Sequence, residues 1–150
     1  MRRIAVLATL LLTSGLTVGV YQVAGADDEG HSDNTINLIE KDTGFTGLDL
    51  GDKGDSPGDE EIFTQDFFDR SGHQVGHGAG FCVSVGGSSA QCQATDVISG
   101  DQLTVTGLVD FSASGFTVAI TGGTGRFNRA RGEEIINETA NGQSITVHLR

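Results

Sequence analysis

The feature that most constrains the fold of this sequence is a series of short strand-like runs separated by tight turns. The runs are rich in Val, Ile, Thr and Phe, and Gly, Asn, Asp or Ser separates them, which is typical of antiparallel strands joined as hairpins. Eight runs are present: Ile36–Glu40, Ile62–Phe68, Val75–Val85, Ala90–Ile98, Leu103–Phe111, Phe116–Thr121, Glu133–Thr139 and Ser144–Leu149. No segment after residue 26 has the pattern of an amphipathic helix, so the sequence predicts an all-β domain.

The number and length of the runs favour a closed sheet. Eight antiparallel strands in about 120 residues can form a β-barrel whose interior holds side chains or one small ligand. A β-sandwich would use the same strands and is the alternative. Residues 43–61, rich in Gly and Asp, are predicted to form a long connection after the first strand.

The two cysteines test this layout. Cys82 and Cys92 lie symmetrically about Gly87, the middle of a Gly-Gly-Ser turn. A three-residue loop there places them opposite each other on neighbouring strands, at a separation that a disulfide spans. The alternative is a pair of buried free thiols. We expect a disulfide, worth up to about 3 kcal/mol for a loop of this length.

The N-terminus has the parts of a secretory signal. Arg2 and Arg3 precede an apolar stretch, and Ala24-Gly25-Ala26 supplies the small residues of a cleavage site. A membrane anchor is the alternative, but the uninterrupted apolar part is short. We expect a signal peptide at 1–26, a disordered acidic lead-in at 27–35, a barrel domain at 36–150 and a secreted protein.

The charge excludes some partners. Without Arg2 and Arg3, seven Lys and Arg remain against 20 Asp and Glu, a net charge of −13. Nucleic acid and anionic membranes need a positive patch, so neither is an expected partner of the processed chain. The acidic loop around Asp49–Glu61 lacks the spacing of an EF-hand, and His73 and His77 on a strand are too far apart to share a metal. We expect no cofactor and no metal.

One segment carries a family resemblance. Residues 122–133 read GGTGRFNRARGE. This segment resembles the signature of the allene oxide cyclase barrel family and of the related plant dirigent proteins. The matching residues are Gly122, Gly123, Thr124, Gly125, Phe127, Ala130, Arg131 and Gly132. The stretches Gly54–Asp59 and Asp69–Gly76 are similar to exported bacterial members, so the resemblance covers residues 36–150.

The resemblance implies an eight-stranded antiparallel barrel around an apolar cavity. Members of this family guide the cyclisation of a reactive fatty-acid epoxide or steer the coupling of phenoxy radicals. It therefore implies a barrel that binds a small apolar molecule and guides its cyclisation or stereoselective coupling, as a ring-forming isomerase without a metal. The alternatives are a non-catalytic carrier or scavenger, and a structural protein with a filled barrel. A homodimer or homotrimer is a further expectation.

The resemblance also suggests candidate catalytic residues. Arg131 matches the signature arginine of the dirigent proteins, which act with acidic groups near the cavity. An acid that sometimes follows Gly-Gly-Thr in these proteins is Gly125 here. Glu40, at the end of the first run, and Asp66, in the second, are the acids best placed to substitute. We therefore expect Arg131, Glu40 and Asp66 at the site, with the arginine paired to one of the acids.

Overall fold

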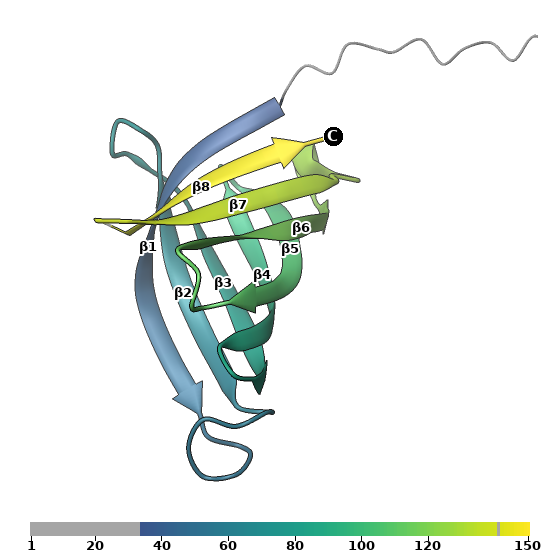
Figure 1. Ribbon diagram of the computed structural model, residues 1–150. Helices are drawn as coiled ribbons and strands as arrows, with labels where there is room; N and C mark the ends of the chain where they lie inside the picture. Colours follow the sequence, from purple (N-terminus) through teal and green to yellow (C-terminus); the bar gives the residue numbers. More distant parts are fainter. Residues whose placement is uncertain (1–33, 141) are drawn as a thin grey trace, which may run out of the picture.

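The eight predicted strands form one closed antiparallel barrel (Figure 1). The computed structural model describes residues 34–140 and 142–150. The strands are β1 (Asn34–Leu48), β2 (Glu60–Phe68), β3 (Gln74–Gly86), β4 (Ser89–Ile98), β5 (Asp101–Asp110), β6 (Gly115–Gly123), β7 (Gly132–Thr139) and β8 (Gly142–Leu149), with a short 3-10 helix, η1 (Gly125–Phe127), between β6 and β7. The predicted fold class is confirmed, and the sandwich alternative is wrong.

The first strand closes the barrel and is longer than the sequence suggested. Its first half pairs with β8, from Asn34 opposite Leu149 to Glu40 opposite Gln143. Its second half continues to Leu48 and pairs with β2, which begins at Glu60, so the predicted connection at 43–61 is wrong for its first six residues and its last two. A bulge between Asp42 and Gly44 allows the long strand to bend between its two partners.

Several N-terminal predictions lie outside the described residues. These are the signal peptide at 1–26 and most of the acidic lead-in. The last two residues of that lead-in, Asn34 and Thr35, belong to β1. In the described part of the chain, no helix is long and apolar enough to cross a membrane.

The cysteine pair is bonded as predicted, although the turn differs from the expected one. Cys82 on β3 lies opposite Cys92 on β4, and the two form a disulfide. Gly86 pairs with Ser89, so the connecting loop has two residues, and a bulge at Val85 restores the symmetric register. Gly86 and Gly87 both have positive φ, at 106° and 64°, a conformation that glycine adopts without strain.

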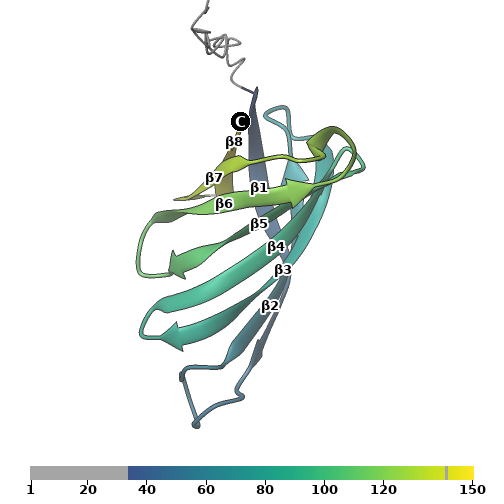
Figure 2. The same cartoon turned by 90° about the vertical axis from the view of Figure 1, so that its right-hand side faces the viewer.

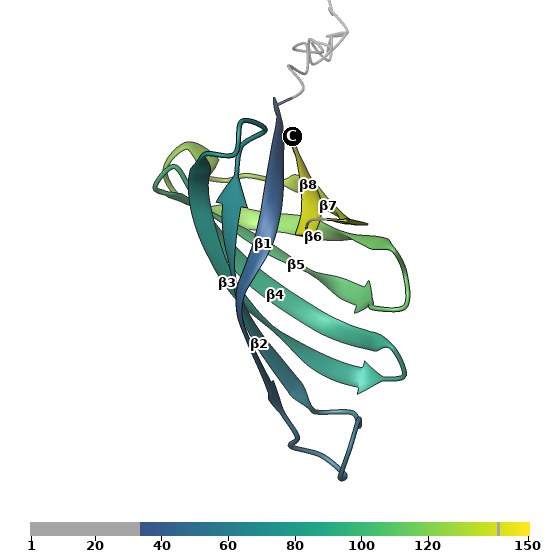
Figure 3. The same cartoon turned by 90° about the vertical axis from the view of Figure 1, so that its left-hand side faces the viewer.

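The two ends of the barrel differ. The β1–β2 loop and the turns of β3–β4 and β5–β6 lie at one end, away from the C-terminus (Figures 2 and 3). The opposite end is filled by large apolar side chains, of which the most buried are Phe67, Leu103, Ile120, Phe127 and Val147. Phe127, from η1, belongs to this core, so the signature segment forms part of the closure of the filled end.

We predict that the disulfide stabilises the barrel substantially. The double variant Cys82→Ala/Cys92→Ala should lose about 2–3 kcal/mol of unfolding free energy, because the bond closes a short loop in the unfolded chain. Urea denaturation of both proteins measures this difference. Reduction of the wild-type protein should give a similar loss, and an unchanged midpoint in both cases would contradict the prediction.

Candidate functional site

A cavity of about 220 Å³ lies at the end opposite the filled core and is partly open to solvent. Its wall is mainly apolar and includes Ala94, Val105, Val109, Val118, Ile136 and the Cys82–Cys92 disulfide. Two phenylalanines that line it are strongly solvent-exposed: Phe45 at 66% and Phe111 at 51%. We call these two the aromatic rim. The predicted apolar cavity is therefore present, and a completely filled barrel is wrong.

Three carboxyl groups are buried where the cavity meets the filled core. Glu40 on β1, Asp96 on β4 and Glu134 on β7 are exposed by only 7%, 1% and 4%. Glu40 and Glu134 line the cavity, whereas Asp96 lies behind them. The three strands are separated in the barrel order, so these side chains meet inside the barrel.

The carboxyl groups are coupled to one another. Glu134 donates a hydrogen bond to Asp96, and Gln65 Nε2 donates another, of 3.5 Å, to Asp96 Oδ1. Burial raises the pKa of Asp96 to about 7, against the opposing effect of these hydrogen bonds. Burial and the charges of Asp96 and Glu40 raise the pKa of Glu134 well above its usual value. The Asp96–Glu134 pair therefore tends to share one proton near neutral pH.

Glu40 differs from this pair because it has no hydrogen-bond partner among the described residues. Burial, with smaller contributions from Asp96, Asp42 and Glu138, raises the pKa of Glu40 to about 8. Every fully enclosed side-chain nitrogen or oxygen in the described part of the chain has a hydrogen-bond partner. The carboxyl group of Glu40 must therefore open onto the cavity.

No positive charge balances these acids. The residues that line the cavity include no Lys, Arg or His. The two ion pairs within residues 34–140 and 142–150, His73–Asp69 and Arg126–Asp101, lie elsewhere. Within these same ranges, no three His, Cys, Asp or Glu side chains are arranged to hold a metal ion. The acids are held in the interior mainly as protonated groups, because a buried carboxylate without a partner is costly.

Glycines on β3 make room for this cluster. Gly78 faces the interior, and a Cβ there would lie 2.7 Å from Asp96 Oδ1 and 3.1 Å from Gln65 Nε2. Two residues further along, a Cβ on Gly80 would clash with the ring of Phe63, which lines the cavity. The side chains of Gln65 and Phe63 on β2 thus lie against Gly78 and Gly80 of β3, which have no side chains of their own.

Of the two acids suggested by sequence, one lies in the cavity. Glu40 is in the cluster, as described above. Asp66 alternates with the buried residues Gln65 and Phe67 on β2, so it faces outward. There it lies between Lys41 and His77 of the neighbouring strands. Gln65 occupies the interior position that we expected for Asp66.

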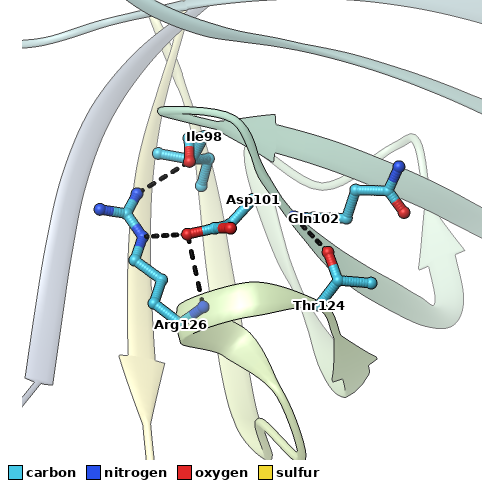
Figure 4. A network of polar contacts seen from close by, with 5 residues as sticks. All are labelled: Ile98, Asp101, Gln102, Thr124 and Arg126. Atoms are coloured by element: carbon cyan, nitrogen blue, oxygen red, sulfur yellow. Dashed lines mark hydrogen bonds and ion pairs between the residues drawn. The ribbon is translucent and has the colours of Figure 1, made fainter.

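The signature segment contributes Phe127 to the filled end, and Figure 4 shows the polar contacts of its residues Thr124 and Arg126. Arg126 donates from Nη2 to the Ile98 carbonyl at 2.9 Å and contacts Asp101, whose carboxylate also accepts the Arg126 backbone N–H. A side chain at Gly125 would clash with this carboxylate, and its φ of 54° also suits glycine. Figure 4 also shows Thr124, whose hydroxyl accepts the Gln102 N–H at 3.1 Å.

Arg131 is exposed and does not line the cavity. Its Nη1 donates to the carbonyls of Thr121 and Ala130, both at 2.7 Å. The described ion pairs include none between Arg131 and either Glu40 or Asp66. These two hydrogen bonds stabilise the connection between β6 and β7. A catalytic role of Arg131 remains a prediction.

Sequence reasoning missed Asp96 and Glu134, although strand alternation could have found them. Asp96 lies on the same face of β4 as Ala90, Cys92, Ala94 and Ile98, and this buried series would be wholly apolar without Asp96. Glu134 likewise shares a face with Ile136. An acid among inward-facing apolar residues is an unusual placement and indicates a function or a partner.

Comparisons with known proteins agree with this architecture. No protein-family model and no curated protein matches the sequence. Among solved structures, a pyocyanin demethylase has a TM-score of 0.71 and 26% identity, over 77% of this chain and 99% of that chain. The Diels-Alderase AbmU from Streptomyces koyangensis has a TM-score of 0.62 and 16% identity, over 81% and 71%. The pterocarpan synthase dirigent protein GePTS1 has a TM-score of 0.58 and 16% identity, over 77% and 81%.

The fold is a dirigent-like barrel. The neighbours at 16% identity show the shared architecture alone. The resemblance that the signature segment suggested is therefore confirmed at the level of the fold. In this chain the signature segment closes the filled end of the barrel, whereas Glu40 and Glu134 line the cavity at the open end.

We predict that Glu40 makes the barrel less stable as pH rises. Its pKa is raised in the folded state, so between about pH 4.5 and 8 the folded protein holds this proton more tightly than the unfolded chain. Stability should therefore fall as pH rises through this interval. Glu40→Gln should remove this part of the loss, on the order of 4 kcal/mol between pH 5 and pH 9, since one pKa unit corresponds to about 1.4 kcal/mol.

Urea denaturation at several pH values measures this effect. The matched control is Glu133→Gln, because Glu133 neighbours Glu134 on β7 but does not line the cavity. The control should keep the pH dependence of the wild type. Parallel pH profiles for wild type and Glu40→Gln would show that Glu40 is not held protonated.

Proposed function

We propose that this chain is an exported dirigent-like barrel that binds a small, largely apolar molecule and guides its cyclisation or stereoselective coupling by moving a proton on it. The apolar wall would hold a flexible ligand in one folded conformation, which supplies orientation. The buried carboxyl groups would supply general acid and base. Export agrees with the Cys82–Cys92 disulfide, since such bonds persist in oxidising compartments.

One observation carries this proposal: Glu40 opens onto the cavity as a protonated acid, while the Asp96–Glu134 pair beside it can accept a proton. With pKa values raised to about 8 for Glu40 and about 7 for Asp96, both states coexist near neutral pH. Acid and base catalysis is most effective when the pKa values lie near the working pH. Perturbed groups of this kind, gathered in a cavity, are typical of functional sites.

The proton balance closes within the site. Glu40 gives its proton to an oxygen or nitrogen of the ligand, and the Asp96–Glu134 pair takes a proton from a carbon of the same ligand. The ligand then gains and loses one proton, and its rearranged electron pairs form the new bond. The cluster keeps its total charge, and one proton returns from the pair to Glu40 before the next turnover. Asp96 acts as a positioning residue because it does not line the cavity.

The neighbouring proteins support a small-molecule reaction in the barrel interior. By their names, AbmU is a Diels-Alderase and GePTS1 is a dirigent protein that is a pterocarpan synthase, and both reactions concern small organic molecules. The pyocyanin demethylase, at 26% identity, is named for an action on pyocyanin. A second candidate function, a non-catalytic carrier, is favoured by the mainly apolar wall but gives the buried carboxyl cluster no role.

We predict that wild type and Glu40→Gln retain different compounds. Both proteins are to be purified from the native host, and their bound molecules extracted and compared by liquid chromatography and mass spectrometry. Because a cyclisation conserves mass, Glu40→Gln should retain an isomer of the wild-type compound, with the same mass and a different retention time. Conversion of this isomer by wild type should be fastest between about pH 7 and 8, where Glu40 is protonated and Asp96 is ionised.

Two variants complete this experiment. Glu133→Gln should retain the same compound as wild type. Arg131→Met tests the signature arginine, and a changed compound there would assign it a role in the reaction. If wild type and Glu40→Gln retain one identical compound, the barrel is a carrier and the catalytic proposal fails.

A further inference from the structure

The cavity has an unusual charge composition. The acidic residues that line it come from three strands: Glu40 and Asp42 from β1, Glu61 from β2, and Glu134 and Glu138 from β7. Asp96 of β4 lies directly behind them, and the lining includes no Lys, Arg or His. Such a cavity repels carboxylates and phosphates and attracts cations, because a low-dielectric wall strengthens the field of its charges.

A buried acid faces this cavity without a partner. Glu40 is more than nine-tenths buried, and no described residue donates a hydrogen bond to it. In a protein interior such a group is costly unless it is protonated or meets a donor. The charges of Asp96, Asp42 and Glu138 all oppose its ionisation. A cation placed against Glu40 would relieve this repulsion, and a neutral ligand would leave it in place.

Aromatic rings supply the rest of the surface. Phe63 and Phe116 line the cavity together with the aromatic rim of Phe45 and Phe111. The faces of aromatic rings carry partial negative charge, and they favour both flat apolar ligands and organic cations. A cavity of about 150 Å³ admits one benzene ring. The cavity here, about 220 Å³, offers room for a fused two-ring system.

We propose that the ligand of this cavity is an aromatic organic base, bound as its cation with the protonated nitrogen against Glu40 and the Asp96–Glu134 pair. This inference rests on the proposed function, since it concerns the same cavity. It specifies that in the complex the ligand nitrogen carries a proton and Glu40 is ionised. An aryl alcohol or carbonyl compound of the same size would only accept a hydrogen bond from the protonated acid.

Three naphthalene probes of the same ring size test this choice. They are 2-(aminomethyl)naphthalene, which is a cation at pH 7, 2-naphthalenemethanol, which is neutral, and 2-naphthoate, which is an anion. Isothermal titration calorimetry of the whole protein at pH 7 should show that the amine binds at least tenfold more tightly than the alcohol, and that the naphthoate does not bind. Repeating the titration in buffers of different ionisation enthalpy should show proton release with the amine alone, because the cation drives Glu40 to ionise.

The variants separate the outcomes. Glu40→Gln should abolish the proton release and should lower the preference for the amine over the alcohol at least tenfold. Its affinity for the alcohol should equal that of the wild type. Glu133→Gln should bind all three probes as wild type does. If the alcohol binds as tightly as the amine, or if no proton is released, the cation proposal is wrong while the isomer experiment still decides the proposed function. If none of the probes binds, the proposal of an aromatic ligand is wrong, and the isomer experiment again decides the proposed function.

Discussion

Closure of the sheet between β1 and β8 is the constraint on which the other features depend. β1 pairs with β8 through its first half and with β2 along most of its length, and this pairing closes the ring of eight strands. Once the ring is closed, each residue has a fixed side, because successive side chains on a strand alternate between the interior and the outer surface. If the pairing register of a strand shifted by one residue, its inward side chains would turn to the outer surface. Such a shift would move Glu40, Asp96 or Glu134 out of the interior together with the core residues of the same strand.

The closed ring is divided into a filled part and a hollow part. Large side chains such as Phe67, Leu103 and Phe127 fill one end, where the signature segment closes the barrel. At the other end several inner positions carry small residues, such as Gly80 and Ala94, beside the Cys82–Cys92 disulfide. The space that they leave is the cavity. The family signature and the candidate site are therefore different parts of the molecule, and the motif identifies the fold and not the chemistry.

The acid cluster lies at the boundary between these two parts and destabilises the fold as pH rises. A barrel selected for stability alone would replace Glu40, Asp96 and Glu134 by apolar residues, since burying them without a cation is unfavourable. Their position together, with Gly78 leaving room for Asp96 and Gln65, is the observation on which the proposed function rests. Proton sharing within the Asp96–Glu134 pair lowers this cost, because only part of the formal charge is present near neutral pH.

The sequence by itself determined the local structure. The eight strands follow from runs of β-forming residues between glycine-rich turns, and the Cys82–Cys92 bond follows from their symmetry about one turn. Both depend on neighbours in the chain. The tertiary structure decided what lies far apart in sequence: that β1 continues to Leu48 on β2, that Gln65 and not Asp66 faces inward, and that Arg131 lies away from the acids. The meeting of Glu40, Asp96 and Glu134 could only be decided there, because side chains on β1, β4 and β7 come together across the interior only when the ring has closed.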